Sequence, residues 1–326
     1  MTRLEPGTAG QAPLLAFEVA IDPPDLALWR PGNTGIEGFT SHSAAAAGPH
    51  VLLLALTHGN EFTGAIVLDR LLRAGLRPAR GRLTIGFANL AAFDAFDRAN
   101  PTVSRFIDED LNRLWDPALL DGSRRSHELD RARAMMPAVA AADVVLDLHS
   151  MLWPSDPLIL CGATARGRAL AEAIGSPGLV VADRGHASGP RLIDHPRFAD
   201  DGPASALLVE AGQHWQPSTV DMAAASIAGL LRHLGLVDHR SALPPTERAM
   251  AGQRTAEVTT VVTANTGSFA FVRAFRGGEA IPHRNTLIAL DGDTEIRTPH
   301  DDCLLVMPSL RPTRGHTAVR LARFVA

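Results

Sequence analysis

Runs of consecutive apolar residues alternate with amphipathic stretches over most of the chain. The clearest run covers 51–56; a polar break follows at 57–61, and apolar positions then recur at helical spacing over 62–74. An unbroken apolar run of this length predicts a strand buried on both faces, and the spacing after it predicts a helix. The pattern also predicts strands at 82–88, 143–149, 158–161, 179–182 and 206–209, and helices at 126–141, 165–174 and 218–234. We therefore expect a mostly parallel sheet flanked by helices.

A different pattern begins after a pair of prolines near position 244. Short runs rich in β-branched residues follow, separated by glycines and by Asp291-Gly292, a pair that suits a tight turn. These runs are 256–263, 267–274, 285–290, 302–307 and 317–325. They predict a small all-β domain over 246–326, behind an α/β domain over 1–245 whose lead-in, 1–50, is rich in loops. The predicted class is α/β, with a mixed, mostly parallel sheet flanked by helices and a small C-terminal all-β domain.

Composition narrows the class of partner. Hydrophobic residues make up 46% of the chain, as in a globular protein with a substantial core, and the net charge is −4, from 31 basic and 35 acidic residues. Without a basic patch, nucleic acid and anionic membranes are not expected partners. The two cysteines, Cys161 and Cys303, exclude a disulfide framework and suit a reducing compartment. No signal peptide and no apolar run of roughly 18 residues is found, so we expect a soluble, cytoplasmic protein. A homo-oligomer is compatible with the sequence.

A histidine and a carboxylate stand three residues apart in the polar break after the first strand. At the entry to a helix, this spacing lets the imidazole of His58 and the carboxylate of Glu61 converge on one point. Two such ligands are half of a catalytic zinc site, which uses three protein ligands and keeps one position open. The alternative is an ordinary helix start, at which Glu61 interacts favourably with the helix dipole. A third ligand decides between the two interpretations.

His149 is the candidate for that third ligand, because it ends the strand predicted at 143–149. The carboxyl ends of parallel strands share one edge of the sheet, so His149 is expected to face the crevice next to His58 and Glu61. Asp147 lies two residues earlier and projects to the same face. It either orients the imidazole or caps the sheet edge.

Further polar residues complete a hydrolytic set. Glu210 follows the strand at 206–209 and suits a general base, although a structural ion pair is the alternative. The stretch 104–114 has no helical or strand period and is typical of a surface loop, yet it carries three useful groups. Arg105 suits an oxyanion, and Asn112 with Arg113 offers donors for a substrate carboxylate. This combination indicates hydrolysis of an amide next to an anionic group.

These motifs carry a resemblance to a known family. His58-Gly59-Asn60-Glu61, the R-x-x-D-x-D-L-N-R run at 105–113, Asp147-Leu148-His149 and Val209-Glu210-Ala211-Gly212 come in the order and approximate spacing of the succinylglutamate desuccinylase/aspartoacylase family. That family is related to the zinc carboxypeptidases. The resemblance covers roughly 45–235 and is weaker in the β tail. It implies a zinc carboxypeptidase-like fold, one zinc ion per chain held by His58, Glu61 and His149, Glu210 as general base and acid, Arg105 polarising the scissile carbonyl, and Asn112 and Arg113 binding a substrate carboxylate.

Two departures from the family pattern bear on the substrate. Aspartoacylases place another substrate arginine shortly before the catalytic glutamate, whereas 198–204 contains no arginine here. Arg191 and Arg197 are the candidates to replace it. After the glutamate, 211–214 reads Ala-Gly-Gln-His where Val-Gly-Pro is common. The sequence therefore leaves the acyl group and the amine open.

Three functions are compatible with the sequence. The first is a zinc-dependent deacylase that acts on a small anionic N-acyl amino acid or a related N-acyl amine. The second is a carboxypeptidase-like enzyme on short peptides, which an open groove would favour over a pocket closed by the β domain and the 183–203 loop. The third is an inactive, metal-stabilised binding module, which the complete set of catalytic residue types argues against.

Overall fold

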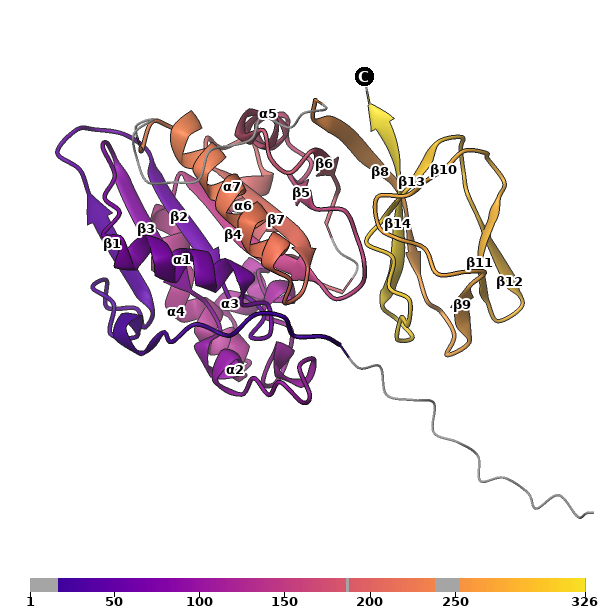
Figure 1. Cartoon of the computed structure of the whole chain (residues 1–326), viewed down its shortest axis with the longest axis horizontal. Coiled ribbons are helices and arrows are strands. Elements are labelled where there is room, and N and C mark those ends of the chain that lie inside the picture. The colour runs from indigo at the N-terminus through magenta and orange to yellow at the C-terminus, as the bar shows by residue number, and fades with distance from the viewer. Residues whose placement is uncertain (1–16, 186–187, 238–251, 326) are drawn as a thin grey trace, which may run out of the picture.

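The computed structural model describes residues 17–185, 188–237 and 252–325. Its centre is a sheet of eleven strands in the order β1-β3-β2-β4-β7-β5-β6-β8-β14-β13-β10, and a separate sheet has the order β12-β11-β9 (Figure 1). The strands are β1 (Phe39–Ser43), β2 (His50–Ala55), β3 (Arg82–Phe87), β4 (Val144–Met151), β5 (Leu158–Leu160), β6 (Leu179–Ala182), β7 (Ser205–Gln213), β8 (Arg254–Thr263), β9 (Phe269–Phe271), β10 (Ala280–Ile281), β11 (Leu287–Asp291), β12 (Thr294–Arg297), β13 (Cys303–Val306) and β14 (Thr317–Val325).

Four parallel strands, β3, β2, β4 and β7, form the middle of the α/β part. They come from the apolar runs that the sequence predicts to be buried, and β4 is buried along its whole length. An unbroken apolar run suits such a strand because helices cover both of its faces. The antiparallel β1 closes the edge beside β3, and β5 pairs antiparallel with β7.

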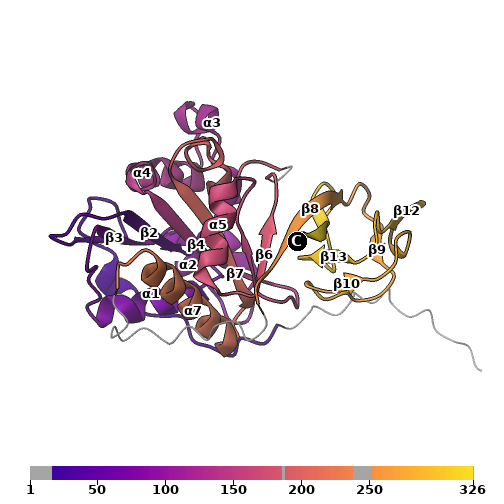
Figure 2. The ribbon, with the colours of Figure 1, turned by 90° about the horizontal axis from the view of Figure 1, so that it is seen from above.

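Helices cover the two faces of this sheet (Figure 2). The helices α1, α5 and α7 share one hydrophobic core, and α4 shares the other with the apolar side chains of the opposite face. Side chains cap several of them: Ser126 Oγ, for example, accepts a hydrogen bond from Leu129 N at the start of α4. The helices are α1 (Thr63–Arg73), α2 (Leu90–Asp94), α3 (Pro117–Asp121), α4 (His127–Ala141), α5 (Ala165–Ile174), α6 (Pro196–Ala199) and α7 (Pro217–His233), with 3₁₀ turns η1 (Ala27–Trp29), η2 (Val103–Arg105), η3 (Leu111–Arg113) and η4 (Leu192–Asp194).

The C-terminal strands continue the main sheet. β8 pairs in parallel with β6 and antiparallel with β14, and β13 and β10 follow. The small sheet of β9, β11 and β12 lies beyond them, and Asp291, at the end of β11, pairs with Thr294 across the tight turn made by Gly292 and Asp293. The predicted fold class is confirmed. The predicted domain boundary between 245 and 246 lies outside the described residues and stays a prediction; the two predicted parts share one sheet.

Two strands extend further than the sequence predicts. β4 was expected to end at His149 and β7 to end before Glu210, but both continue because they pair with each other, with His149 opposite Glu210 and Met151 opposite Gln213. The 183–203 stretch, predicted as a long loop, contains η4 and α6 in its described part. No helix in the described ranges has the length and apolar character needed to cross a membrane.

Candidate metal centre and its pocket

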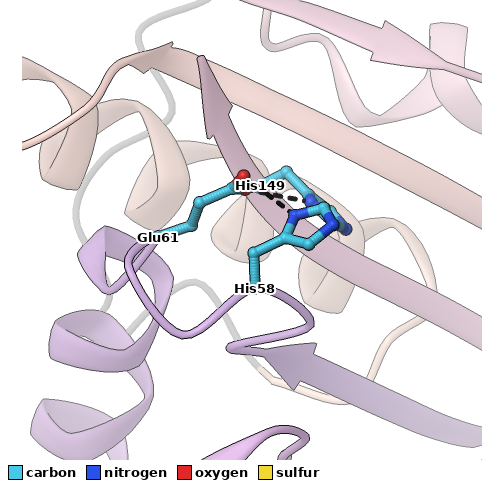
Figure 3. Close-up of side chains that lie close together, drawn as sticks. All are labelled: His58, Glu61 and His149. Atoms are coloured by element: carbon cyan, nitrogen blue, oxygen red, sulfur yellow. Dashed lines mark hydrogen bonds and ion pairs between the residues drawn. The ribbon is translucent and has the colours of Figure 1, made fainter. Parts of the chain in front are cut away.

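Three of the residues singled out above lie together at the carboxyl edge of the parallel strands. One ligand atom from each of His58, Glu61 and His149 lies within 4.8 Å of the others, and all three side chains are buried. In Figure 3 they point toward one another, the first two from the loop before α1 and His149 from β4. The sequence separation between the early pair and His149 is bridged because β2 and β4 are neighbouring parallel strands.

The loop that carries His58 and Glu61 is tightly held. A Cβ atom on Gly59 would lie 2.3 Å from the backbone carbon of Ala92, so only glycine fits at this point. The Gly59 N–H donates to the carbonyl oxygen of Arg105 at 3.0 Å. From the other side, the indole N–H of Trp215 donates to the carbonyl oxygen of Asn60 at 2.9 Å. These contacts hold the backbone of the loop in place and thereby position the side chains of His58 and Glu61.

Each imidazole is oriented by a carboxylate on its far side. His58 Nε2 lies 2.9 Å from Asp110 Oδ1, and His149 Nε2 lies 2.8 Å from Asp147 Oδ2. The hydroxyl of Thr57 donates to the second oxygen of Asp147 at 2.8 Å. Of the two interpretations of Asp147, the geometry supports the orienting one. A neutral ring that donates through Nε2 keeps its lone pair on Nδ1.

The two Nδ1 atoms both face Glu61. His58 Nδ1 lies 2.8 Å from Glu61 Oε1, and His149 Nδ1 lies 3.0 Å from Glu61 Oε2. Within the described residues, His58 Nδ1 is buried and makes no hydrogen bond. A buried nitrogen without a hydrogen bond, aimed with a second imidazole at one carboxylate, is the arrangement that a divalent cation satisfies. The donor set of two nitrogens and a carboxylate therefore fits a metal ion such as zinc.

Glu210 lies beside this cluster, because it is the register partner of His149 across β4 and β7. Burial and the charge of Glu61 raise the pKa of Glu210 to about 8. Its Oε2 has no hydrogen-bond partner in the described part of the chain. Glu61 is also buried, but the charges of His58 and His149 and the hydrogen bond with His149 outweigh the burial and hold the pKa of Glu61 well below its usual range. Of these two carboxyl groups, Glu210 is therefore the one that takes up a proton more readily.

Arg105 contacts the cluster directly. Its Nη1 donates to Glu61 Oε1 at 2.9 Å, and its Nη2 donates to Asp110 Oδ2 at 3.1 Å. The Arg105 side chain is 36% exposed, so part of the guanidinium remains accessible. It is a fixed cation at the mouth of the site.

The loop that carries Arg105 is anchored by a residue that the sequence did not single out. Glu128, on α4, is completely buried and accepts the backbone N–H groups of Ile107, Asp108 and Glu109. It also accepts the side-chain N–H of Asn89. One carboxylate thus ties the loop to α4. A lone glutamate in the first turn of a helix gives no sequence signal for this contact.

Asn112 and Arg113 line a pocket with the cluster; its volume is about 450 Å³. The Leu192 N–H donates to Asn112 Oδ1 at 3.0 Å, which leaves the amide nitrogen as a donor. Arg113 Nη1 donates to the carbonyl oxygen of Asn112 at 2.6 Å. Burial lowers the pKa of Arg113 to about 10.

The pocket lining also includes three ionisable residues that the sequence did not assign to the site: His214, His316 and Arg320. His214 Nδ1 lies 2.7 Å from the hydroxyl oxygen of Ser150, and burial lowers the pKa of His214 to about 4. Its position four residues after Glu210 is a signal that could have found it. His316 lies just before β14 and Arg320 lies within it. Both are far in sequence from the motifs of the site, so no local pattern points to them.

Arg191 and Arg197, the two candidates to replace the missing substrate arginine, lie in different parts of the structure. Arg191 lines the pocket, but its guanidinium is bonded to Asp183 and Asp194. Arg197 donates to the carbonyl oxygen of Ala142 and does not line the pocket. All three guanidinium nitrogens of Arg191 are thus engaged by carboxylates, and Arg197 lies outside the pocket lining.

Comparison with known proteins agrees with this geometry. The family model for the succinylglutamate desuccinylase/aspartoacylase catalytic domain matches residues 47–234. A probable aspartoacylase of Parasynechococcus marenigrum (strain WH8102) is 32% identical over 105 residues, which is 31% of this chain and 33% of that protein. The alignment thus spans about a third of the curated relative's length.

Two crystal structures show the same fold. A succinylglutamate desuccinylase/aspartoacylase from Rhodobacter sphaeroides matches with a TM-score of 0.66 and 22% identity, covering 88% of this chain and 89% of that one. A succinylglutamate desuccinylase from Vibrio parahaemolyticus matches with a TM-score of 0.65 and 16% identity, covering 90% and 93%. At these identities the likeness concerns the fold.

Proposed function

Because the chain belongs to the succinylglutamate desuccinylase/aspartoacylase family, we propose that it is a zinc-dependent deacylase. Members of this family are hydrolases that remove acyl groups. The proposed reaction is hydrolysis of the carbon–nitrogen bond in a small N-acyl amino acid or a related N-acyl amine. The observation that carries the proposal is the buried cluster of His58, Glu61 and His149 beside Glu210 in one pocket.

The cluster would hold one zinc ion per chain. The ligands would be the Nδ1 atoms of His58 and His149 and the carboxylate of Glu61, with Asp110 and Asp147 keeping the rings in place. When bound, zinc supplies a Lewis acid that polarises a carbonyl and lowers the pKa of water. The buried negative charge of Glu61 and Asp147 favours a cation at this point.

Glu210 is the proposed proton carrier. Its Oε2 lacks a hydrogen-bond partner among the described residues and lines the pocket, so it is placed to take a proton from the attacking water. It then delivers this proton to the nitrogen of the departing amine. A carboxyl group whose pKa is raised to about 8 suits both steps near neutral pH, because it can hold and release the proton there.

Cationic and amide donors are proposed to stabilise the negative charges of the oxyanion and of the substrate carboxylate. Arg105 is proposed to donate to the carbonyl oxygen as it becomes an oxyanion, since a fixed cation helps most where the charge develops. Asn112 and Arg113 are proposed to bind a substrate carboxylate through the free amide nitrogen and the guanidinium. The substrate is therefore a small anionic N-acylated molecule.

The shape of the pocket favours a small substrate over a peptide. Its lining includes Met307, Pro308, Thr313 and His316 from the C-terminal strands and the loops between them, as well as the metal cluster. The C-terminal part of the chain therefore forms part of the pocket wall. A volume of about 450 Å³ suits one N-acyl amino acid.

The test is a Glu210→Gln variant of the full chain, loaded with zinc, against a panel of N-acetyl, N-succinyl and N-formyl amino acids. We expect the variant to keep its zinc and to lose turnover about 100- to 10,000-fold. Glu172→Gln is the matched control, because Glu172 is exposed on α5, away from the pocket, and contacts Thr255. Retained turnover in the Glu210 variant would remove this residue from the proton-carrying role. A wild-type protein that hydrolyses nothing on the panel, or one that a chelator leaves fully active, would contradict the proposed function.

A further inference from the structure

Arg320 reaches the pocket from the C-terminal strand β14. Its side chain is buried, with 6% of the residue exposed, and it lines the same cavity as Glu61 and Glu210. Arg320 lies far beyond residues 47–234, the part matched by the family model. A strand outside the catalytic motifs therefore contributes a cation to the candidate active site.

This guanidinium is poorly compensated. Its Nε has no hydrogen-bond partner among the described residues, and the carboxylate it approaches is Asp183, at 3.5 Å. Asp183 already accepts two hydrogen bonds from Arg191, at 2.8 and 2.7 Å. Arg191 also donates to Asp194, so both carboxylates are already engaged by Arg191. A buried guanidinium with unused donors is costly unless a ligand uses them.

Arg113 lines the same pocket. It is half-buried, and its Nη1 donates to the carbonyl oxygen of Asn112. Besides burial, the charge of Asp110 acts to raise its pKa, and the charges of Arg105, Arg191 and Arg320 act to lower it. The pocket thus receives guanidinium groups from η3 and from β14.

Arg191 and Arg320 compete for the same carboxylate. Arg191 is paired with Asp183 and Asp194 at 2.7 Å, whereas Arg320 approaches Asp183 at 3.5 Å. A ligand carboxylate in the pocket would give the Arg320 guanidinium an acceptor of its own.

We propose that Arg320, together with Arg113, binds the carboxylate of the substrate, so that Arg320 determines the preference for N-acyl amino acids over N-acyl amines that lack a carboxylate. This inference rests on the proposed function, because it assigns the substrate class of the same pocket. Arg320 thereby takes the place of the arginine that is missing before Glu210. Much of the remaining lining is apolar, including Met151, Trp153 and Met307, and suits an apolar amino-acid side chain.

The test compares two substrates that differ only in the carboxylate, N-acetyl-leucine and N-(3-methylbutyl)acetamide, on the zinc-loaded full chain. For Arg320→Gln we expect kcat/KM on N-acetyl-leucine to fall about 10- to 100-fold, with little change on the carboxylate-free amide. Arg323→Gln is the matched control, since Arg323 is exposed on the same strand.

A binding measurement separates this proposal from the proposed function. Calorimetric titration of N-acetyl-leucine into wild type and Arg320→Gln should show affinity about 10-fold or more lower in the variant, even if neither protein turns the compound over. In that case the deacylase proposal fails and the carboxylate site stands. If Arg320→Gln does not fold, Arg320→Lys keeps the charge and should lose part of the discrimination between the two substrates. Equal losses on both substrates, unchanged affinity, or no binding of N-acetyl-leucine to wild type would each overturn the inference.

Discussion

Replacing Glu128 with glutamine should loosen the loop that carries Arg105. Glu128 Oε1 accepts the Ile107 N–H at 2.6 Å and the Asn89 side-chain N–H at 2.9 Å. Oε2 accepts the Asp108 and Glu109 N–H groups at 3.0 and 3.2 Å. Each oxygen thus serves two donors, so an amide NH₂ placed on either side faces two N–H groups with no acceptor.

The size of the effect follows from that count. A buried donor left without an acceptor costs about 1–3 kcal/mol, so two of them should lower the free energy of unfolding by roughly 2–6 kcal/mol. This is a large share of the roughly 5–15 kcal/mol typical of a folded protein. Because Asn89 Oδ1 already accepts the Ala92 N–H, flipping that amide cannot supply the missing acceptor.

Denaturant-induced unfolding measures the change in stability, and hydrogen exchange at the Ile107 and Asp108 amides locates it. We expect both amides to exchange faster in the variant. Glu109→Gln is the control: this side chain is 27% exposed and paired with Arg124 and Ser126, so the loss should stay below about 1 kcal/mol. A Glu128→Gln protein with stability and amide protection equal to wild type would refute the anchoring role.

Three other changes probe different parts of the molecule. Asp147→Asn should weaken zinc binding about 10- to 100-fold, measured by competition with a chelator, because the His149 ring loses its carboxylate; unchanged affinity would contradict that role. Gly59→Ala should lower the melting temperature and impair zinc binding, since the new methyl group has no room beside the backbone; a variant with wild-type melting and zinc content would show that the loop can move. Asp194 tests pH dependence: although burial alone acts to raise its pKa, the hydrogen bonds and charge of Arg191 lower it below the ordinary 3.8. Its stabilising contribution is therefore complete above the unfolded pKa of about 4 and is lost as the pH falls through the lower folded value, so Asp194→Asn should flatten the stability curve below pH of about 4. If the dependence of stability on pH is the same in Asp194→Asn as in wild type, the Asp194–Arg191 pair does not contribute to it.

Much of the fold is predictable because its strands are apolar runs and its helices carry a clear period. The family was predictable as well, since its motifs occupy the ends of those strands. His58, Glu61 and His149 could be placed together from topology, because neighbouring parallel strands deliver their carboxyl ends to one edge. Their roles, and those of Glu210, Arg105, Asn112 and Arg113, stay proposals.

Other features depend on contacts that no local pattern encodes. The lengths of β4 and β7 are set by their mutual pairing, which carries both strands past His149 and Glu210. Glu128 looks like an ordinary residue of a helix start until the loop at 107–109 folds onto it. Arg320 sits in a β run that carries no catalytic motif, and the pairing of β14 with β8 joins that run to the main sheet.

The pairing of β6 with β8 has a consequence for how the protein can be divided. A fragment that stops at 237 would leave β6 with the backbone groups of one side unpaired. Such an open edge invites pairing with another chain and hence aggregation. The region that carries the family motifs is therefore not expected to behave as an independent unit when it is expressed without the strands that follow it.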